Sequence, residues 1–103
     1  MAILYISEYA KLAIDSRGLP VMAGKEPAVA TQVVSIGAST APSAAFTSAT
    51  KFVRLHCDVA CNYLFGPATP TALKDTSPRM AAGQTEFFGV VPGYMVAVIA
   101  PTV

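Results

Sequence analysis

Charged side chains are scarce in this sequence. They make up 13% of its 103 residues, which is about half the share in an ordinary soluble domain. None occurs between Pro27 and Thr50, between Val59 and Leu73, or after Glu86. A domain this small has too little interior to hide so much uncharged chain, so we expect other subunits to cover part of its surface. The alternative is a neutral surface of Ser, Thr and Ala that water hydrates adequately.

The sequence also has no cluster of basic residues. The net charge is +1, and the lysines and arginines are scattered singly, which leaves no electrostatic footprint for a nucleic acid. No basic amphipathic helix is predicted that would lie on a membrane. Glycines and prolines interrupt the uncharged C-terminal stretch, unlike in a transmembrane helix, and the first residues lack the features of a signal peptide. We therefore expect neither a nucleic-acid partner nor a membrane, and a protein made in the cytoplasm.

Residues that carry catalysis or bind metals are few. The single histidine, His56, has no second histidine to serve as a base for a nucleophile. His56 and Cys57 are neighbours on a predicted strand, so their side chains point to opposite faces. Cys61 would bring the ligand count to three, where structural zinc needs four. With no nucleophile elbow and no phosphate-binding glycine loop, we predict a non-enzymatic protein without catalytic residues, metal or cofactor.

The two cysteines, Cys57 and Cys61, lie four positions apart. On one continuous strand they would be too far apart for a disulfide. A tight turn at residues 58–60 would place them opposite each other and allow a bridge. That turn lacks the Gly or Asn that such a hairpin prefers, so the residues favour two buried free thiols.

Residues 51–58 alternate between apolar and polar with period two. This is the pattern of a half-buried strand, which has one face toward the core and one outward. The buried face carries Val53, Leu55 and Cys57, and the outward face carries Phe52, Arg54, His56 and Asp58.

The outward face of this strand is the candidate interaction site. Arginine and aromatic side chains are enriched at the centres of protein interfaces. Phe52, Arg54 and His56 are therefore the candidate contacts, with Arg54 as the anchor that faces the partner. The alternative is a solvated face on which Arg54 pairs with a nearby acid, and such surface pairs contribute little.

Aromatic and β-branched residues predict further strands. Residues 3–9 fit a strand, although Tyr5, Tyr9, Leu12 and Ala13 could also line a short N-terminal helix. The last predicted strand is apolar on both sides, as expected for a strand covered on two faces. The further strands are predicted over residues 19–22, 29–36, 61–65, 84–91 and 94–100, with an extended segment at 44–49 and loops at 37–43 and 66–83.

Pro92 and Gly93 join the last two predicted strands. They suit a type II turn, in which the glycine takes a positive φ. Such a turn fits a tight hairpin poorly, so it can instead mark a corner where the chain passes from one sheet to another. Seven or eight short strands in a single domain, residues 1–103, predict an all-β fold, either a β-sandwich or a jelly-roll-like barrel.

Residues 50–100 contain a distinctive order of strands and turns. It runs through residues 50–58 (TKFVRLHCD), 64–67 (LFGP), 81–83 (AAG), 86–90 (EFFGV), 92–93 (PG) and 96–99 (VAVI). This pattern resembles small structural proteins in the virions of tailed bacteriophages, most closely the head decoration, or cement, proteins. It contains no catalytic or binding motif to carry over to this chain.

The resemblance implies a compact β subunit that clamps neighbouring capsid proteins. We therefore expect a protein made in the bacterial host cytoplasm and located in the virion, on the phage head. Its partners would be the major capsid protein or other virion proteins, and it would form a homo-oligomer, a dimer or trimer. A similar pattern would suit a tail, neck or fibre module that binds a receptor or carbohydrate. That alternative requires Tyr63 or Tyr94 to face solvent.

Overall fold

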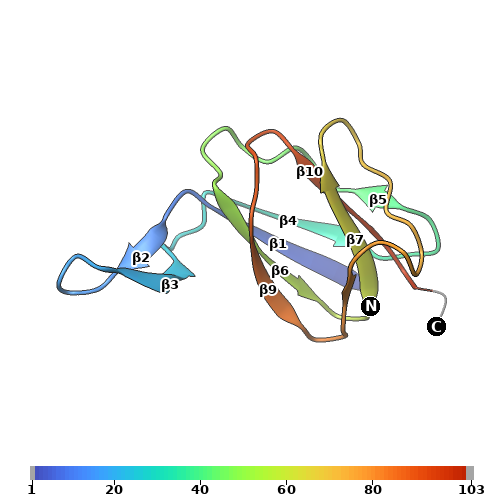
Figure 1. Cartoon of the computed structure of the whole chain (residues 1–103), viewed down its shortest axis with the longest axis horizontal. Coiled ribbons are helices and arrows are strands. Elements are labelled where there is room, and N and C mark those ends of the chain that lie inside the picture. The colour runs from blue at the N-terminus through green and yellow to red at the C-terminus, as the bar shows by residue number, and fades with distance from the viewer. Residues whose placement is uncertain (1, 102–103) are drawn as a thin grey trace.

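A computed structural model describes residues 2–101 of the chain and, of Met22, the backbone. Within this range the chain forms ten strands and no helix (Figure 1). The predicted all-β fold is confirmed. The strands are β1 (Ile3–Tyr9), β2 (Leu12–Ile14), β3 (Pro20–Gly24), β4 (Ala30–Ser35), β5 (Ala41–Pro42), β6 (Phe52–Cys57), β7 (Cys61–Gly66), β8 (Arg79–Met80), β9 (Thr85–Gly89) and β10 (Met95–Ile99).

The N-terminal segment is a strand, and the short helix considered as its alternative is wrong. Leu4, Ile6 and Glu8 are buried while Tyr5 is exposed, which is the period of a strand. β1 pairs antiparallel with both β4 and β6. It is therefore a central strand whose backbone is hydrogen-bonded along both edges.

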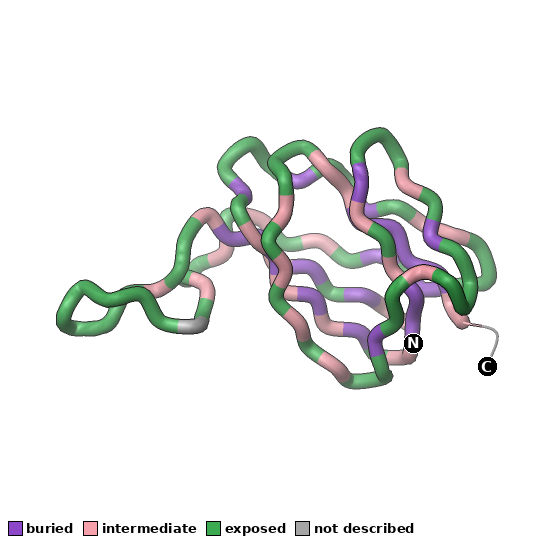
Figure 2. Tube along the Cα trace, viewed as in Figure 1, coloured by how far each residue is buried: buried purple, intermediate pink, exposed green. Residues whose placement is uncertain are grey.

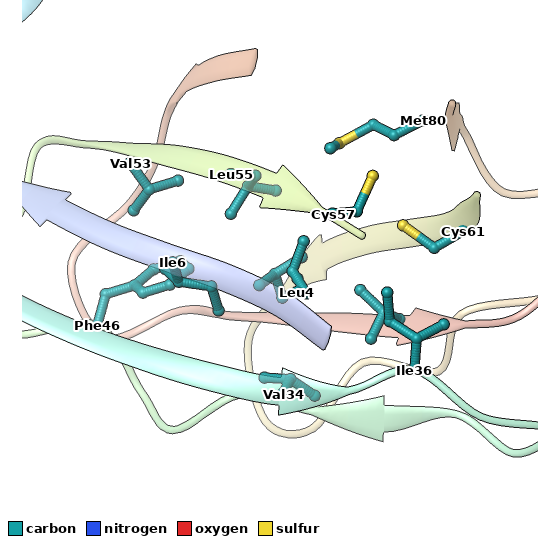
Figure 3. Packing of buried hydrophobic residues seen from close by; sticks show 12 residues of the cluster. Leu4, Ile6, Val34, Ile36, Phe46, Val53, Leu55, Cys57, Cys61 and Met80 are labelled. Atoms are coloured by element: carbon teal, nitrogen blue, oxygen red, sulfur yellow. The ribbon is translucent and has the colours of Figure 1, made fainter. Parts of the chain in front are cut away.

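The strands form two four-stranded antiparallel sheets and one hairpin. Sheet I has the order β4-β1-β6-β9, and sheet II has the order β5-β10-β7-β8. The two sheets pack face to face, because buried residues of both contribute to one core (Figure 3). The hairpin of β2 and β3 stands apart from this core (Figure 1) and is called the arm, residues 11–25. The core contains Leu4, Ile6, Val34, Ile36, Phe46, Val53, Leu55, Cys57, Cys61, Met80, Val96 and Val98.

Most predicted strands are present. β6, β7, β9 and β10 lie where the sequence predicts strands, and β3 and β4 overlap predicted ones. The unpredicted strands β2, β5 and β8 are two or three residues long. Residues 44–49, which were expected to be extended, form no strand. Instead, Phe46 from this segment enters the core.

The turn at Pro92 and Gly93 is a corner between the two sheets. The backbone N–H of Tyr94 donates to the carbonyl of Val91 at 3.1 Å, and Gly93 has a φ of 86°. β9 belongs to sheet I and β10 to sheet II. The predicted positive φ and the passage between sheets are both confirmed.

Part of the outer face of sheet II is covered by the chain itself, while Leu64 on this face is exposed. Ala97 and Ile99 of β10 are buried together with Ala72, which belongs to the segment of residues 67–78. The side chain of Asn62 holds this segment: its Nδ2 donates to the carbonyl of Ser77 at 2.7 Å, and its Oδ1 accepts from the N–H of Asp75 at 3.2 Å. β10 is therefore covered on both faces, as the sequence predicts.

Glu8 is a buried carboxylate on the inner face of β1. Its Oε1 accepts hydrogen bonds from the N–H of Thr47 at 2.9 Å and from the hydroxyl of Thr50 at 2.8 Å. Its Oε2 accepts one from Nε2 of Gln32 at 3.2 Å. These bonds satisfy the desolvated carboxylate and attach the connection between β5 and β6 to sheet I.

Both cysteine thiols are free and buried, as the residue pattern favours. Cys57 ends β6 in sheet I, and Cys61 begins β7 in sheet II, so the two lie close together where the chain crosses between sheets (Figure 3). The Cys57 thiol donates to the carbonyl of Ala81 at 3.0 Å. Burial, and secondarily the neighbouring Cys57, raises the pKa of Cys61 to about 12.

Candidate interaction surface

The outer face of sheet I brings together side chains from its four strands. The three residues singled out from the sequence lie on this face, in register with outward residues of β1. The pairs are Phe52 with Tyr9, Arg54 with Ser7, and His56 with Tyr5. Their predicted placement on one outward face is therefore confirmed, while their contact with a partner stays a prediction.

Aromatic rings form a row across this face. Tyr9 and Phe52 stack with their ring centroids 5.3 Å apart, and the centroids of Phe52 and Phe87 are 6.2 Å apart. Phe87 stands on β9 directly opposite Arg54 of β6 and is exposed. Packed aromatic pairs prefer separations of this size. Tyr9 is buried and Phe52 is half-buried, so they support the exposed ring of Phe87 from the side.

His56 is an outward strand residue. Its Nδ1 lies 2.7 Å from the hydroxyl oxygen of Thr85, and its ring centroid lies 6.3 Å from that of Tyr5. Among residues 2–101, no three His, Cys, Asp or Glu side chains are grouped so that they could hold a metal ion. The contacts of His56 given by the structure are this hydrogen bond and this ring contact.

Arg54 lies between two hollows of this face. The first, of about 620 Å³, is lined by Tyr5, Val33 and His56 among others. The second, of about 580 Å³, lies between Phe87 and the base of the arm; we call it the Arg54 hollow. Among the residues that the structure describes, none forms a hydrogen bond or ion pair with the Arg54 side chain. The predicted alternative, in which a nearby acid pairs with Arg54, is therefore not what the structure shows.

Tyr9 fixes the base of the arm against sheet I. Its hydroxyl donates to Oε2 of Glu26 at 2.6 Å. Burial raises the pKa of Tyr9, and the Glu26 carboxylate raises it further. The Tyr9 ring lies so close to Gly24 that a Cβ there would come within 2.4 Å of it. Glycine is therefore required at this contact.

The arm projects along the longest dimension of the molecule, which is 47 Å (Figure 1). Asp15 builds its tip: Oδ1 accepts hydrogen bonds from the N–H groups of Arg17 at 2.8 Å and Leu19 at 3.0 Å. Gly18 supplies a positive φ of 81° in the same turn. The arm is exposed over nearly its whole length (Figure 2), yet hydrogen bonds define both its tip and its base.

Exposed large apolar side chains concentrate on the arm and on the outer face of sheet I. Of the described side chains, eleven are of this kind, and seven of them lie in these two places. Concentration of exposed apolar area marks an interaction surface more strongly than scattered residues do. The seven are Leu12, Ile14, Leu19 and Val21 on the arm, and Tyr5, Val33 and Phe87 on sheet I.

Sequence reasoning predicted a strand over residues 19–22 but missed its partner β2 and the projection of the arm, and it missed the contribution of Tyr5 and Phe87. In the arm, the pairing register shifts between Leu12 and Ile14, which breaks the alternation that signals a strand. Tyr5 and Phe87 could have been found, because both take outward positions once residues 3–9 and 84–91 are read as strands beside residues 51–58.

The uncharged segments have two different environments. In the C-terminal one, residues 96–99 are buried inside the fold. In residues 28–50, small side chains such as Ala38, Ser39 and Ala45 face solvent. Internal burial and small exposed residues therefore account for part of the low charge. The expectation that other subunits cover the protein depends on sheet I and the arm.

The described part of the chain contains no helix long and apolar enough to cross a membrane. Comparison of the chain with protein-family models, with curated proteins and with solved structures finds no match. The resemblance to phage virion proteins therefore stays a hypothesis.

Proposed function

We propose that this chain is a non-enzymatic structural protein of a bacteriophage virion, most like a head decoration protein, which stabilises the head by binding across capsid subunits. The observation that carries the proposal is the open outer face of sheet I. It combines exposed apolar and aromatic side chains with an arginine that forms no hydrogen bond or ion pair within the described chain. Interface centres have this composition.

The fold supplies a rigid platform for such contacts. Phe52, Arg54 and His56 stand on a central strand of sheet I, and Tyr5 and Val33 extend the surface over β1 and β4. A stable contact buries about 800 Å² per partner, and apolar area contributes roughly 25 cal/mol per Å². Repeated over many copies, contacts across the seams between capsid subunits would resist internal pressure.

The alternative, a tail, neck or fibre module that binds carbohydrate, receives less support. It requires Tyr63 or Tyr94 to face solvent. Both tyrosines are half-buried and pack against the core. The Tyr63 ring centroid lies 5.2 Å from that of Phe88, and burial raises the pKa of Tyr63. Tyr63 therefore has little open ring on which a sugar could stack, and Tyr94 contributes to a hollow of about 410 Å³ beside Phe65 and Val91.

Cosedimentation with capsids tests the proposal. Capsids would be assembled from the major capsid protein encoded nearest to this chain's gene, without this protein. We expect the wild type to bind them and to raise the temperature at which they disrupt. Tyr5→Ser combined with Val33→Asp should abolish binding, because both residues line the first hollow.

Leu73→Ser is the matched control, because Leu73 is comparably exposed but lies in the segment that covers sheet II. It should bind like the wild type. A wild-type protein that does not bind capsids, or binding that survives the changes on sheet I, would contradict the proposal. Specific hits on a glycan array would favour the fibre alternative.

A further inference from the structure

The tip of the arm exposes two large apolar side chains and stands apart from the two sheets (Figure 1). Ile14 is 57% exposed and Leu19 is 55% exposed, although the turn between them is fixed by Asp15. An isolated two-stranded hairpin is at best marginally stable in water. A hairpin whose turn and base are already ordered loses less entropy on binding, which favours insertion into a partner.

The Arg54 hollow has the size and chemistry to receive such a tip. Its volume of about 580 Å³ would hold a few side chains. Phe87 and Ala28 give it apolar walls, and Arg54 and Glu26 give it one positive and one negative charge. Glu26 keeps the Tyr9 hydroxyl as its neighbour, and Arg54 forms no hydrogen bond or ion pair with residues 2–101.

The tip carries the complementary set of groups. Asp15 and Arg17 provide one negative and one positive charge between the apolar Ile14 and Leu19. Oδ1 of Asp15 is engaged in the turn, and the carboxylate retains a second oxygen that can accept from a guanidinium. Opposite charges placed in this way favour one docking register over others.

A tip cannot reach the hollow of its own chain. The hollow lies at the base of the arm, and the arm extends away from sheet I toward its tip (Figure 1). The occupant must therefore come from another molecule, and a second copy of this chain carries a segment that matches the hollow in apolar character and in charge.

We propose that the tip of the arm docks into the Arg54 hollow of a second copy, with Asp15 facing Arg54 and Arg17 facing Glu26. Reciprocal exchange of two arms gives a closed dimer, and a head-to-tail arrangement that closes gives a ring. This inference rests on the proposed function, because it names a second copy of the chain as one partner of the outer face of sheet I. It leaves the first hollow, with Tyr5 and Val33, for capsid contacts.

The oligomeric state of the purified full chain tests this inference. The measurement is sedimentation equilibrium over a concentration series in low salt, with circular dichroism to verify folding. The wild type should be a dimer or a small ring. Arg54→Glu in the hollow and Leu19→Ser at the tip should each raise the dissociation constant about tenfold or more.

Two further variants test the charge of Asp15 at the tip and the specificity of the effect. Asp15→Asn removes the charge but keeps an oxygen that can accept the two N–H groups of the turn, and it should weaken association several-fold. Leu73→Ser is the control, because Leu73 is 56% exposed on the other side of the molecule and its loss should leave association unchanged.

Mixing the two defective variants provides the decisive result. Arg54→Glu keeps an intact tip and Leu19→Ser keeps an intact hollow, so an equimolar mixture should form heterodimers through one intact contact more tightly than either variant self-associates. A wild type that remains monomeric at about 1 mM, or a mixture that associates no more tightly than the separate variants, overturns the inference. Self-association without capsid binding would instead overturn the proposed function and leave this contact standing.

Discussion

The outer faces of the two sheets differ in what covers them. Sheet II lies under residues 67–78, which bury Ala97 and Ile99 and are attached through Asn62. Within the described residues, sheet I has no such cover: Tyr5 and Val33 remain exposed on it. The base of the arm lies against it at Tyr9.

This difference separates the residues that stabilise the fold from those available for binding. An antiparallel sheet needs one buried face, and its other face can be solvated without loss of the fold. On the outer face of sheet II, Ala97 and Ile99 gain burial from their own chain, although Leu64 opposite Ala97 is still 37% exposed. On the outer face of sheet I, Tyr9 is buried against the base of the arm, whereas Tyr5, Val33 and Phe87 are exposed. Exposed apolar side chains that gather in this way favour association.

The largest change in the free energy of unfolding is expected from a cavity on the covered outer face of sheet II. Ile99→Ala leaves a cavity beneath residues 67–78 and should lower the free energy of unfolding by about 3 kcal/mol. Ile14→Ala makes the same chemical change on the exposed arm and should lower it by less than about 0.5 kcal/mol. Denaturant unfolding at low protein concentration measures both. If both variants lost the same free energy of unfolding, the arm would be packed in solution and would not differ from the covered side of sheet II.

A smaller decrease in the free energy of unfolding is expected when residues 67–78 are detached from sheet II. Asn62→Ala leaves the carbonyl of Ser77 and the N–H of Asp75 without this partner, which should cost about 2 kcal/mol. Limited proteolysis should then cut within residues 67–78 sooner than in the wild type. His56→Ala, which removes one hydrogen bond on the open face, should cost less than about 1 kcal/mol. If cleavage does not change, Asn62 does not hold the segment.

Because Cys61 is buried in the core shared by both sheets, we expect the free energy of unfolding to depend on pH. The pKa of Cys61 is raised to about 12 from an ordinary value near 9, mainly by burial. The unfolded chain therefore releases this proton at a lower pH than the folded protein does. The contribution of Cys61 to stability is fully present below pH 9 and is lost as the pH rises toward 12.

Cys61→Ala is the variant that isolates this contribution, because the pKa values of Tyr9 and Tyr63 are raised too. Its unfolding free energy should fall less steeply than that of the wild type above pH 9. A thiol reagent at pH 8 should modify the wild type in denaturant but hardly in the native state. Rapid native modification would show that the two sheets are not closed over the thiols.

The strands at the centre of each sheet could be predicted because their signal is local. The alternation of Val53, Leu55 and Cys57 with Phe52, Arg54 and His56 identifies β6 and its outward face. The same rule fails at Glu8, which takes an inward position as a charged residue. Its partners Thr47 and Thr50 lie about 40 residues away in the sequence, and local patterns carry no information about such contacts.

The candidate surface was predictable in part for the same reason. One strand of it could be identified, but its neighbours depend on the strand order of sheet I, which places β6 between β1 and β9. Strand order is set by long-range packing. Of the arm, only a strand over residues 19–22 was predicted, because β2 and β3 pair through a shifted register and nothing in the sequence indicates that the hairpin leaves the core.

The smallest effect on stability is expected from Val33→Thr on the open face. Threonine has nearly the shape and β-propensity of valine, and Val33 is 62% exposed, so the added hydroxyl stays in water. The free energy of unfolding should change by less than about 0.5 kcal/mol. Val98→Thr makes the same change inside the core and should lower the free energy of unfolding by roughly 1–3 kcal/mol, because the hydroxyl is desolvated there.

The two variants should have the opposite effects on capsid binding: Val33→Thr should bind more weakly, and folded Val98→Thr should bind like the wild type. If Val33→Thr destabilised the fold as much as Val98→Thr does, sheet I would be covered in solution by its own chain, and its outer face would not be available for a partner.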